Sequence, residues 1–142
     1  MTIAVELAKS CDYAIRGLLC LAERPDPFEP VLLRDIAEQA RAPEPFMSKV
    51  FQSLRASHVV RSHRGRDRGY SLARPPQDIS LYDVILAMQG PAALQSIAPS
   101  VSGRGGENAF LRAWEQIEQQ VVDALKRNTL QTMLQTSVEG NA

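Results

Sequence analysis

Arginine is concentrated in one short stretch of this 142-residue chain. Residues 41–74 hold eight basic and two acidic side chains, a net charge of +6, whereas residues 1–40 and 75–142 each carry −3. Arg64, Arg66 and Arg68 share one turn with Gly65 and Gly69. Guanidinium groups bind phosphate oxygens and are attracted to the negative potential of a narrow DNA groove. The block therefore predicts a surface for a polyanion, with an ordinary solvated face as the alternative.

Cysteine and histidine offer little further chemistry. Cys11 and Cys20 are nine residues apart on one expected helix, roughly 13.5 Å along its axis and on opposite faces. They can neither bridge nor share a metal, so we expect small buried apolar residues, with a redox-sensing thiol as the alternative. His58 and His63 are separated by an odd number of positions in or beside a strand, so their side chains should point to opposite faces. We therefore expect no metal site formed by this pair.

Several function classes are excluded or disfavoured. The sequence contains no Ser/His/Asp constellation, phosphate-binding glycine loop or plausible pair of catalytic carboxylates, so we expect neither an enzyme nor a cofactor. No window approaches 18 consecutive apolar residues, which argues against a membrane span. No signal peptide is visible, and the expected location is the cytoplasm.

The basic block is predicted to lie on two short helices. Leu33 to Ala40 shows amphipathic helical spacing, and a second helix is expected over Pro43 to Ala56. A polar face of the second helix carries Ser48, Lys49 and Gln52. Two short helices joined by three or four residues are typical of a helix-turn-helix. The expected buried stripe of the second helix comprises Phe46, Met47, Val50, Phe51 and Leu54.

Two short strands, Val59 to Arg64 and Tyr70 to Arg74, are expected on either side of the arginine turn. A strand ribbon directly after a helix-turn-helix predicts a winged helix. A core helix capped by Ser10 and ending near Ala22 to Arg24 precedes this unit. After Pro75 and Pro76, a helix capped by Ser80 should run to Gly90.

The C-terminal part has a different pattern. Residues 91–107 are expected to form a loop, and one long helix should follow from about Glu107 to Asn128 or beyond. Glu139 to Ala142 is expected to be disordered. Apolar spacings of four and three predict a seam for a second chain, with packing onto the same domain as the alternative. The seam residues are Phe110, Trp114, Ile117, Val121, Ala124, Asn128 and Gln131.

The predicted fold is mainly α with a small β-ribbon. A winged helix-turn-helix DNA-binding domain should cover residues 7–90, the loop residues 91–107, and a dimerisation helix with a C-terminal segment residues 108–136.

Seven stretches of the chain carry a family resemblance. Together they resemble the Rrf-two (Rrf2) family of bacterial winged-helix regulators, over about Leu7 to Leu134. The resemblance implies a dimeric transcription factor, most often a repressor, that senses iron–sulfur status, nitric oxide, redox state or cysteine supply. The stretches are Tyr13-Ala14, Leu33 to Ala40, Phe46 to Leu54, Val60 to Leu72 with Arg64-Gly65-x-x-x-Gly69-Tyr70-x-Leu72, Arg74-Pro75-Pro76, Ile79 to Val84, and Thr129-Leu130 after the long helix.

The chain departs from the family at the cluster ligands. Cluster-binding members carry three cysteines spaced by six, the last one six residues before a tryptophan. Counting back from Trp114 gives Asn108, Ser102 and Ser96. Neutral amide and hydroxyl groups are poor ligands for iron–sulfur chemistry, so we expect no cluster and no metal. Ser48 stands where cluster regulators often have Glu, so operator preference cannot be transferred.

These observations favour a homodimeric, sequence-specific DNA-binding repressor without a cluster or other cofactor. The helix over Pro43 to Ala56 would enter the major groove of a palindromic operator, and the arginine turn would reach the minor groove or its phosphates. A protein-interaction module and a small-ligand-responsive regulator remain the alternatives. An effector or protein partner is open, and no membrane is expected.

Overall fold

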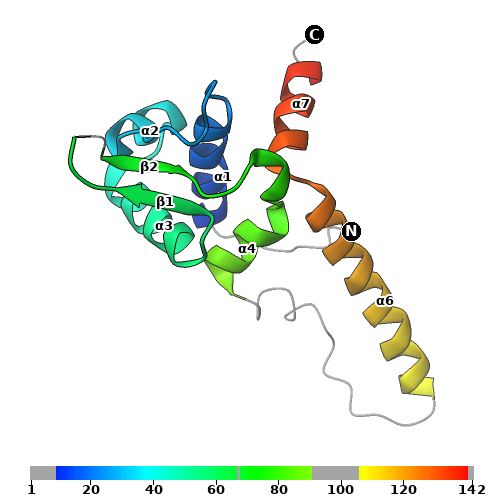
Figure 1. The fold of residues 1–142 in the computed structure, drawn as a ribbon. Helices are drawn as coiled ribbons and strands as arrows, with labels where there is room; N and C mark the ends of the chain where they lie inside the picture. Colours follow the sequence, from blue (N-terminus) through cyan, green and yellow to red (C-terminus); the bar gives the residue numbers. More distant parts are fainter. Residues whose placement is uncertain (1–8, 67, 91–105, 141–142) are drawn as a thin grey trace.

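The computed structural model describes residues 9–66, 68–90 and 106–140. It is mostly helical, with one two-stranded antiparallel sheet, which confirms the predicted fold class (Figure 1). Its elements are α1 (Lys9–Ala22), α2 (Leu33–Ala40), α3 (Glu44–Ala56), β1 (Val60–His63), β2 (Gly69–Leu72), η1 (Pro76–Asp78), α4 (Leu81–Gln89), α6 (Gly106–Arg127) and α7 (Leu130–Gly140).

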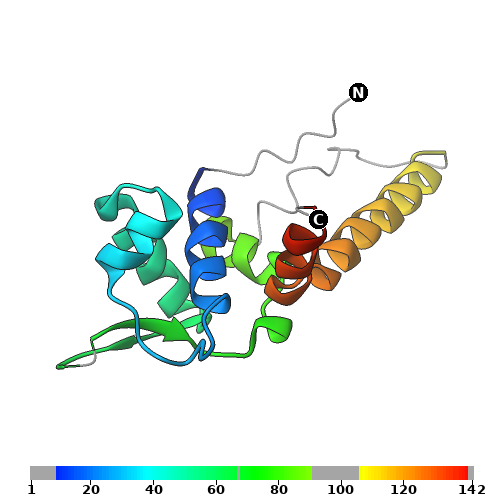
Figure 2. The ribbon, with the colours of Figure 1, turned by 90° about the horizontal axis from the view of Figure 1, so that it is seen from above.

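Helix α1 is the centre of the core. It contacts α2 and α3 on one side and α4 and α7 on the other (Figure 2). Gly17 lets α1 approach α3 closely, because a Cβ at this position would stand 2.7 Å from Cε1 of Phe51. Ser10 lies inside α1 instead of capping it. The core therefore holds α2 and α3 in a fixed arrangement on α1.

The helix-turn-helix forms where the sequence predicts it. Helix α2 is capped at its C-terminus by Arg41 in the left-handed conformation. Pro43 is the N-cap of α3, which therefore begins one residue later than the predicted start at Pro43. The prediction that Phe46 is buried was wrong: its side chain is 58% exposed. It precedes the i, i+3, i+4, i+7 stripe that begins at Met47, so its ring lies at the flank of α3, beside Tyr13.

The wing, β1 and β2 with the turn between them, is shorter than predicted but in the expected place. Val60 pairs with Leu72, and His63 pairs with Gly69. Val31 adds a pairing that the sequence did not indicate, since its N–H donates to the Tyr70 carbonyl at 2.9 Å and its carbonyl accepts from the Tyr70 N–H at 2.8 Å. The wing is thereby joined to the loop between α1 and α2.

Helix α4 begins and ends as predicted. Ser80 and Asp83 form a capping box, and Gly90 is the C-cap. Among the described helices, none is long and apolar enough to cross a membrane.

Helix α6 lies where the long helix was predicted, but the chain does not continue as one helix beyond Asn128. Helix α6 ends at Arg127, the Asn128 carbonyl accepts from the Leu81 N–H at 2.7 Å, and the Thr129 side chain accepts from the N–H of Thr132 at the start of α7. The predicted seam positions Asn128 and Gln131 are therefore not on α6. Residues 139–140 belong to α7, so the expectation of a disordered tail was wrong there.

Candidate nucleic-acid interface

The exposed face of α3 carries the three predicted contact residues. Lys49 and Gln52 are exposed, and Ser48 is half-buried. The Gln52 amide donates to Ser48 Oγ at 3.3 Å. The opposite face is anchored by Met47, Phe51 and other fully buried side chains. Helix α3 can thus present polar side chains without losing its core contacts.

The wing turn presents the predicted arginines to solvent. Arg64, Arg66 and Arg68 are all exposed, and none of them forms an ion pair with a carboxylate in the described part of the chain. Gly65 adopts a positive φ of 88° with open space where a Cβ would be. The turn therefore offers three guanidinium groups on a backbone shape that glycine favours.

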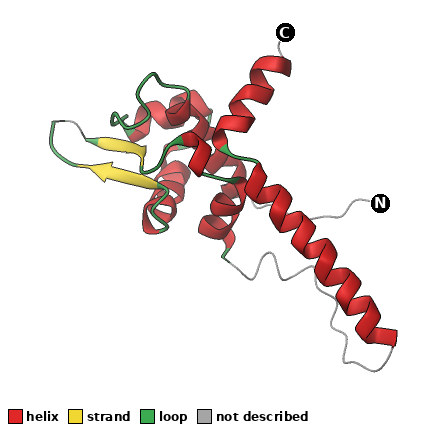
Figure 3. Cartoon of the chain, turned by 45° about the vertical axis from the view of Figure 1, so that its right-hand side comes forward, coloured by secondary structure: helices red, strands yellow, loops and turns green. Residues whose placement is uncertain are grey.

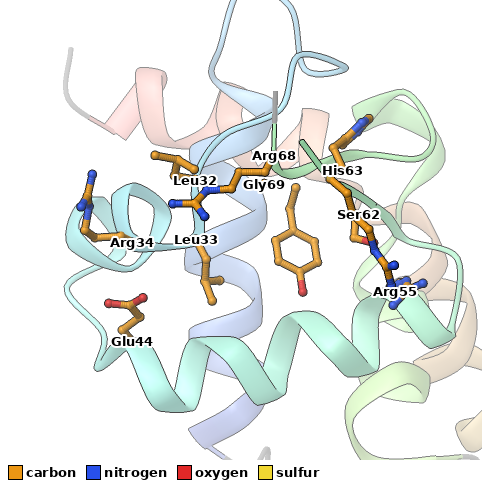
Figure 4. A pocket seen from close by; sticks show the side chains of 11 residues that line it. Leu32, Leu33, Arg34, Glu44, Arg55, Ser62, His63, Arg68 and Gly69 are labelled. Atoms are coloured by element: carbon orange, nitrogen blue, oxygen red, sulfur yellow. The ribbon is translucent and has the colours of Figure 1, made fainter. Parts of the chain in front are cut away.

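The structure brings the wing and α3 together around one cleft. The ring of Tyr70 packs edge-on against Phe51 of α3, with 5.1 Å between centroids. A cleft of about 470 Å³ is lined by the start of α2, the two ends of α3 and the wing. Its charged lining residues are Arg34, Glu44, Arg55, Arg64 and Arg68, with His63 at its edge (Figure 4).

Two of these lining arginines were missed as site residues. Arg55 was counted in the basic block, and its place in the last turn of α3 was the available indication that it faces the wing. Arg34 lies outside that block, beside Asp35, and its proximity to the wing depends on how α2 packs. Only the tertiary arrangement brings these two residues to the cleft.

The histidines do not form a metal site. His63 Nε2 is hydrogen-bonded to Oγ of the buried Ser71 at 2.8 Å, and His58 is exposed. Among the described residues, no group of three or more His, Cys, Asp or Glu side chains is arranged to hold a metal ion.

Both thiols are on α1. Cys11 is buried, with its Sγ 3.4 Å from the Gln89 side-chain oxygen, and Cys20 is half-buried. Burial raises the pKa of both thiols, and nearby Glu23 raises the pKa of Cys20 further. A higher pKa lowers the fraction of reactive thiolate at neutral pH. This favours the interpretation that both are packing residues.

The structure describes little of the residues at the family's cluster positions. Ser96 and Ser102 lie outside the described residues. Asn108 is in the first turn of α6, and its side chain is not described.

Helix α6, which carries the seam residues Phe110, Trp114, Ile117 and Val121, projects from the rest of the domain (Figure 3). Phe110 and Ile117 are 50% and 43% exposed, and Trp114 and Val121 are half-buried. The rings of Phe110 and Trp114 stack, with centroids 6.2 Å apart. Trp114 Nε1 is buried without a hydrogen-bond partner in the described structure. This helix therefore carries an apolar stripe that its own domain leaves partly uncovered.

Known proteins share both the sequence and the fold. The Rrf2 family model, described as an iron-dependent transcriptional regulator, matches residues 7–136. A Synechocystis sp. protein named as an HTH-type transcriptional regulator is 30% identical over 131 residues, which cover 89% of this chain and 85% of that protein. The structure of CymR, the global cysteine regulator of Bacillus subtilis, aligns with a TM-score of 0.73 and 26% identity, covering 90% of this chain and 95% of CymR. The structure of T. potens IscR aligns with a TM-score of 0.72 and 27% identity, covering 96% of this chain and 91% of the IscR chain.

Proposed function

The chain belongs to the Rrf2 family of transcriptional regulators, and we propose that it is a homodimeric, sequence-specific DNA-binding repressor. One observation carries the DNA-binding proposal: Arg55 at the end of α3 and the wing arginines Arg64 and Arg68 line the same basic cleft. The half-buried Tyr70 of the wing packs on the buried Phe51 of α3, so both elements can engage one ligand at once.

The expected docking follows from the shapes of the DNA grooves. The major groove is wide enough for α3, and Ser48, Lys49 and Gln52 would contact bases and backbone there. The thinner wing turn would enter the adjacent minor groove or contact its phosphates through Arg64, Arg66 and Arg68. Gly65 would let the wing backbone approach the groove wall.

Dimerisation is proposed through α6. An apolar stripe that is partly exposed, with Phe110 and Ile117 at its surface, is unusual on a monomer and suits a partner helix with the same spacing. A two-fold dimer would place two copies of α3 on two half-sites, which predicts a palindromic operator.

The residues of this chain do not fit an iron–sulfur cluster. Such a cluster is held mainly by thiolates, and Ser96, Ser102 and Asn108 supply only neutral oxygen and nitrogen donors. The two thiols of the chain are on α1, where Cys11 is buried beside Gln89. We therefore propose a regulator whose input is different, such as a small ligand, a partner protein or oxidation of one cysteine.

Selection of bound fragments from genomic DNA tests the proposal. The full chain is mixed with sheared genomic DNA at physiological salt, and the retained fragments are sequenced and footprinted. The proposal predicts a recurrent palindrome and a promoter that loses activity when the protein is expressed. Retention without any shared sequence would contradict specific binding, and no retention would favour a protein-interaction module.

A further inference from the structure

We propose that the cleft between α3 and the wing holds a segment of the DNA sugar–phosphate strand, and that Arg34 and Arg55 bind its phosphates together with Arg64 and Arg68. This inference rests on the proposed DNA-binding function. It adds two binding residues and assigns a ligand chemistry, the phosphodiester, to a defined place in the fold.

The charge of the cleft is the first argument. Four arginines line it, and the only carboxylate in the lining is that of Glu44, in the first turn of α3. In three other hollows on the described surface, the positive and negative lining charges are closer to balance. One combines Arg24 with Asp35 and Glu38, and the next two each combine two arginines with one carboxylate, Asp83 or Glu29. A net excess of three positive charges around one cleft is most stable when an anion occupies it.

The position of the cleft is the second argument. The major and minor grooves of a duplex are separated by one sugar–phosphate strand. If α3 lies in the major groove and the wing lies in the adjacent minor groove, that strand must pass between them. The cleft occupies this place, with Arg34 at one end, Arg55 at the other and Arg68 between (Figure 4).

The surroundings of Arg34 and Arg55 leave their charges available. The Arg34 side chain is 72% exposed, and its single recorded ion pair is a long contact of 3.9 Å to Asp35. Arg55 is exposed and forms no ion pair with any described carboxylate. Neither residue belongs to the buried core. Their guanidinium groups are therefore better explained by a ligand than by a structural role within the domain.

Charge-removing variants test this inference on the full chain. The double variant Arg34→Gln with Arg55→Gln keeps side-chain length but removes both charges, and Arg34→Lys with Arg55→Lys restores the charges. Arg112→Gln with Arg127→Gln, two exposed arginines on α6, is the matched control. The readout is the slope of log K against log salt for the selected operator, with thermal unfolding to confirm that each variant is folded.

The inference predicts that the glutamine variant in the cleft loses about two units of salt slope, since each phosphate contact contributes roughly 0.9. Its affinity should fall about ten- to hundredfold, while the footprinted sequence stays the same. The lysine variant should keep the slope, and the α6 control should match the wild type. An unchanged slope for the glutamine variant, with wild-type DNA binding intact, would overturn the inference but leave the proposed function standing.

Neutral methylphosphonates, introduced one at a time into the operator backbone, locate the contact. The wild-type protein should be weakened at the phosphates that lie between the bases protected by α3 and those protected by the wing. At these positions the glutamine variant should show no further loss. Additive losses at every position would contradict the assignment. If the wild-type protein binds no operator at all, the proposed function itself fails and the inference fails with it.

Discussion

The ring of Tyr70 in the wing meets the ring of Phe51 in α3 edge-on, with their centroids 5.1 Å apart. Phe51 is fully buried, and on its other side it lies against Gly17 of α1. One aromatic contact therefore links the wing, the proposed recognition helix and the central helix. The packing of the half-buried Tyr70 on the buried Phe51 therefore holds the wing and α3 in a defined relative position.

The attachment of the wing to Val31 predicts that a side chain at position 69 strongly destabilises the protein. Gly69 has a φ of +133°, and a Cβ there would stand 2.2 Å from the Val31 carbonyl oxygen. We expect Gly69→Ala to lower the free energy of unfolding by about 2–4 kcal/mol, through backbone strain and loss of the Val31 pairing. Gly65→Ala, at a positive φ with open space, should cost only about 1 kcal/mol. Urea unfolding measures both, and equal stability of the two variants would contradict this account of the wing.

At a second backbone position, the predicted substitution raises the stability of the protein. His58, between α3 and β1, has a φ of 61°, a left-handed conformation that costs a non-glycine residue about 1–2 kcal/mol. His58→Gly should therefore stabilise the protein by about 0.5–1 kcal/mol, after allowing for the greater unfolded-state entropy of glycine. His58→Ala, which keeps the strained backbone, should change stability by less than about 0.5 kcal/mol. A loss of stability in His58→Gly would show that the imidazole itself makes a stabilising contact.

Sequence periodicity predicted the elements well because their apolar spacing is regular. The buried stripe of α2 and the Ser80 cap of α4 are local features, and the structure has both in the expected places. Phe46 was included in the predicted buried stripe, but it lies one residue before the stripe that α3 buries. The break at Asn128 depends on a hydrogen bond from Leu81, far away in the sequence, and no local pattern indicated it.

The candidate site was only partly visible in the sequence. The wing arginines stand out because they share one glycine turn. The place of Arg34 in the cleft and the pairing of Val31 with Tyr70 require the packing of α2 and its preceding loop against the wing. Contacts of this kind join residues more than 25 positions apart, and periodicity carries no information about them.

The dimer proposal predicts a severe effect of a charge on the α6 stripe. In a dimer, Ile117→Asp would bury an unpaired carboxylate between two helices, at a cost of several kcal/mol. We expect sedimentation to show a monomer and operator binding to lose its half-site cooperativity. Gln116→Asp adds the same charge away from the stripe and should leave the dimer intact. A dimer of Ile117→Asp that persists at low micromolar concentration would indicate that α6 is not the interface.

The absence of cluster ligands predicts a colourless protein. After purification without oxygen and treatment with iron and sulfide, the chain should show no absorbance band near about 400 nm, because thiolate-to-iron charge transfer requires bound cysteines. Its operator affinity should also be unaffected by the treatment. A brown protein that keeps its colour in the Cys11→Ser, Cys20→Ser double variant would contradict the proposal, since no thiol would then remain to explain it.

The central claim is that the wing and α3 bind DNA together, and the salt dependence of operator binding by wing variants tests it most directly. Arg64→Ala and Arg66→Ala remove exposed side chains without core contacts, so both should fold normally. Each should bind the operator roughly tenfold more weakly and lose about one unit of salt slope, as expected for one phosphate contact, while Arg112→Ala on α6 should behave as the wild type. Affinity and slope that are unchanged in both wing variants would contradict the claim.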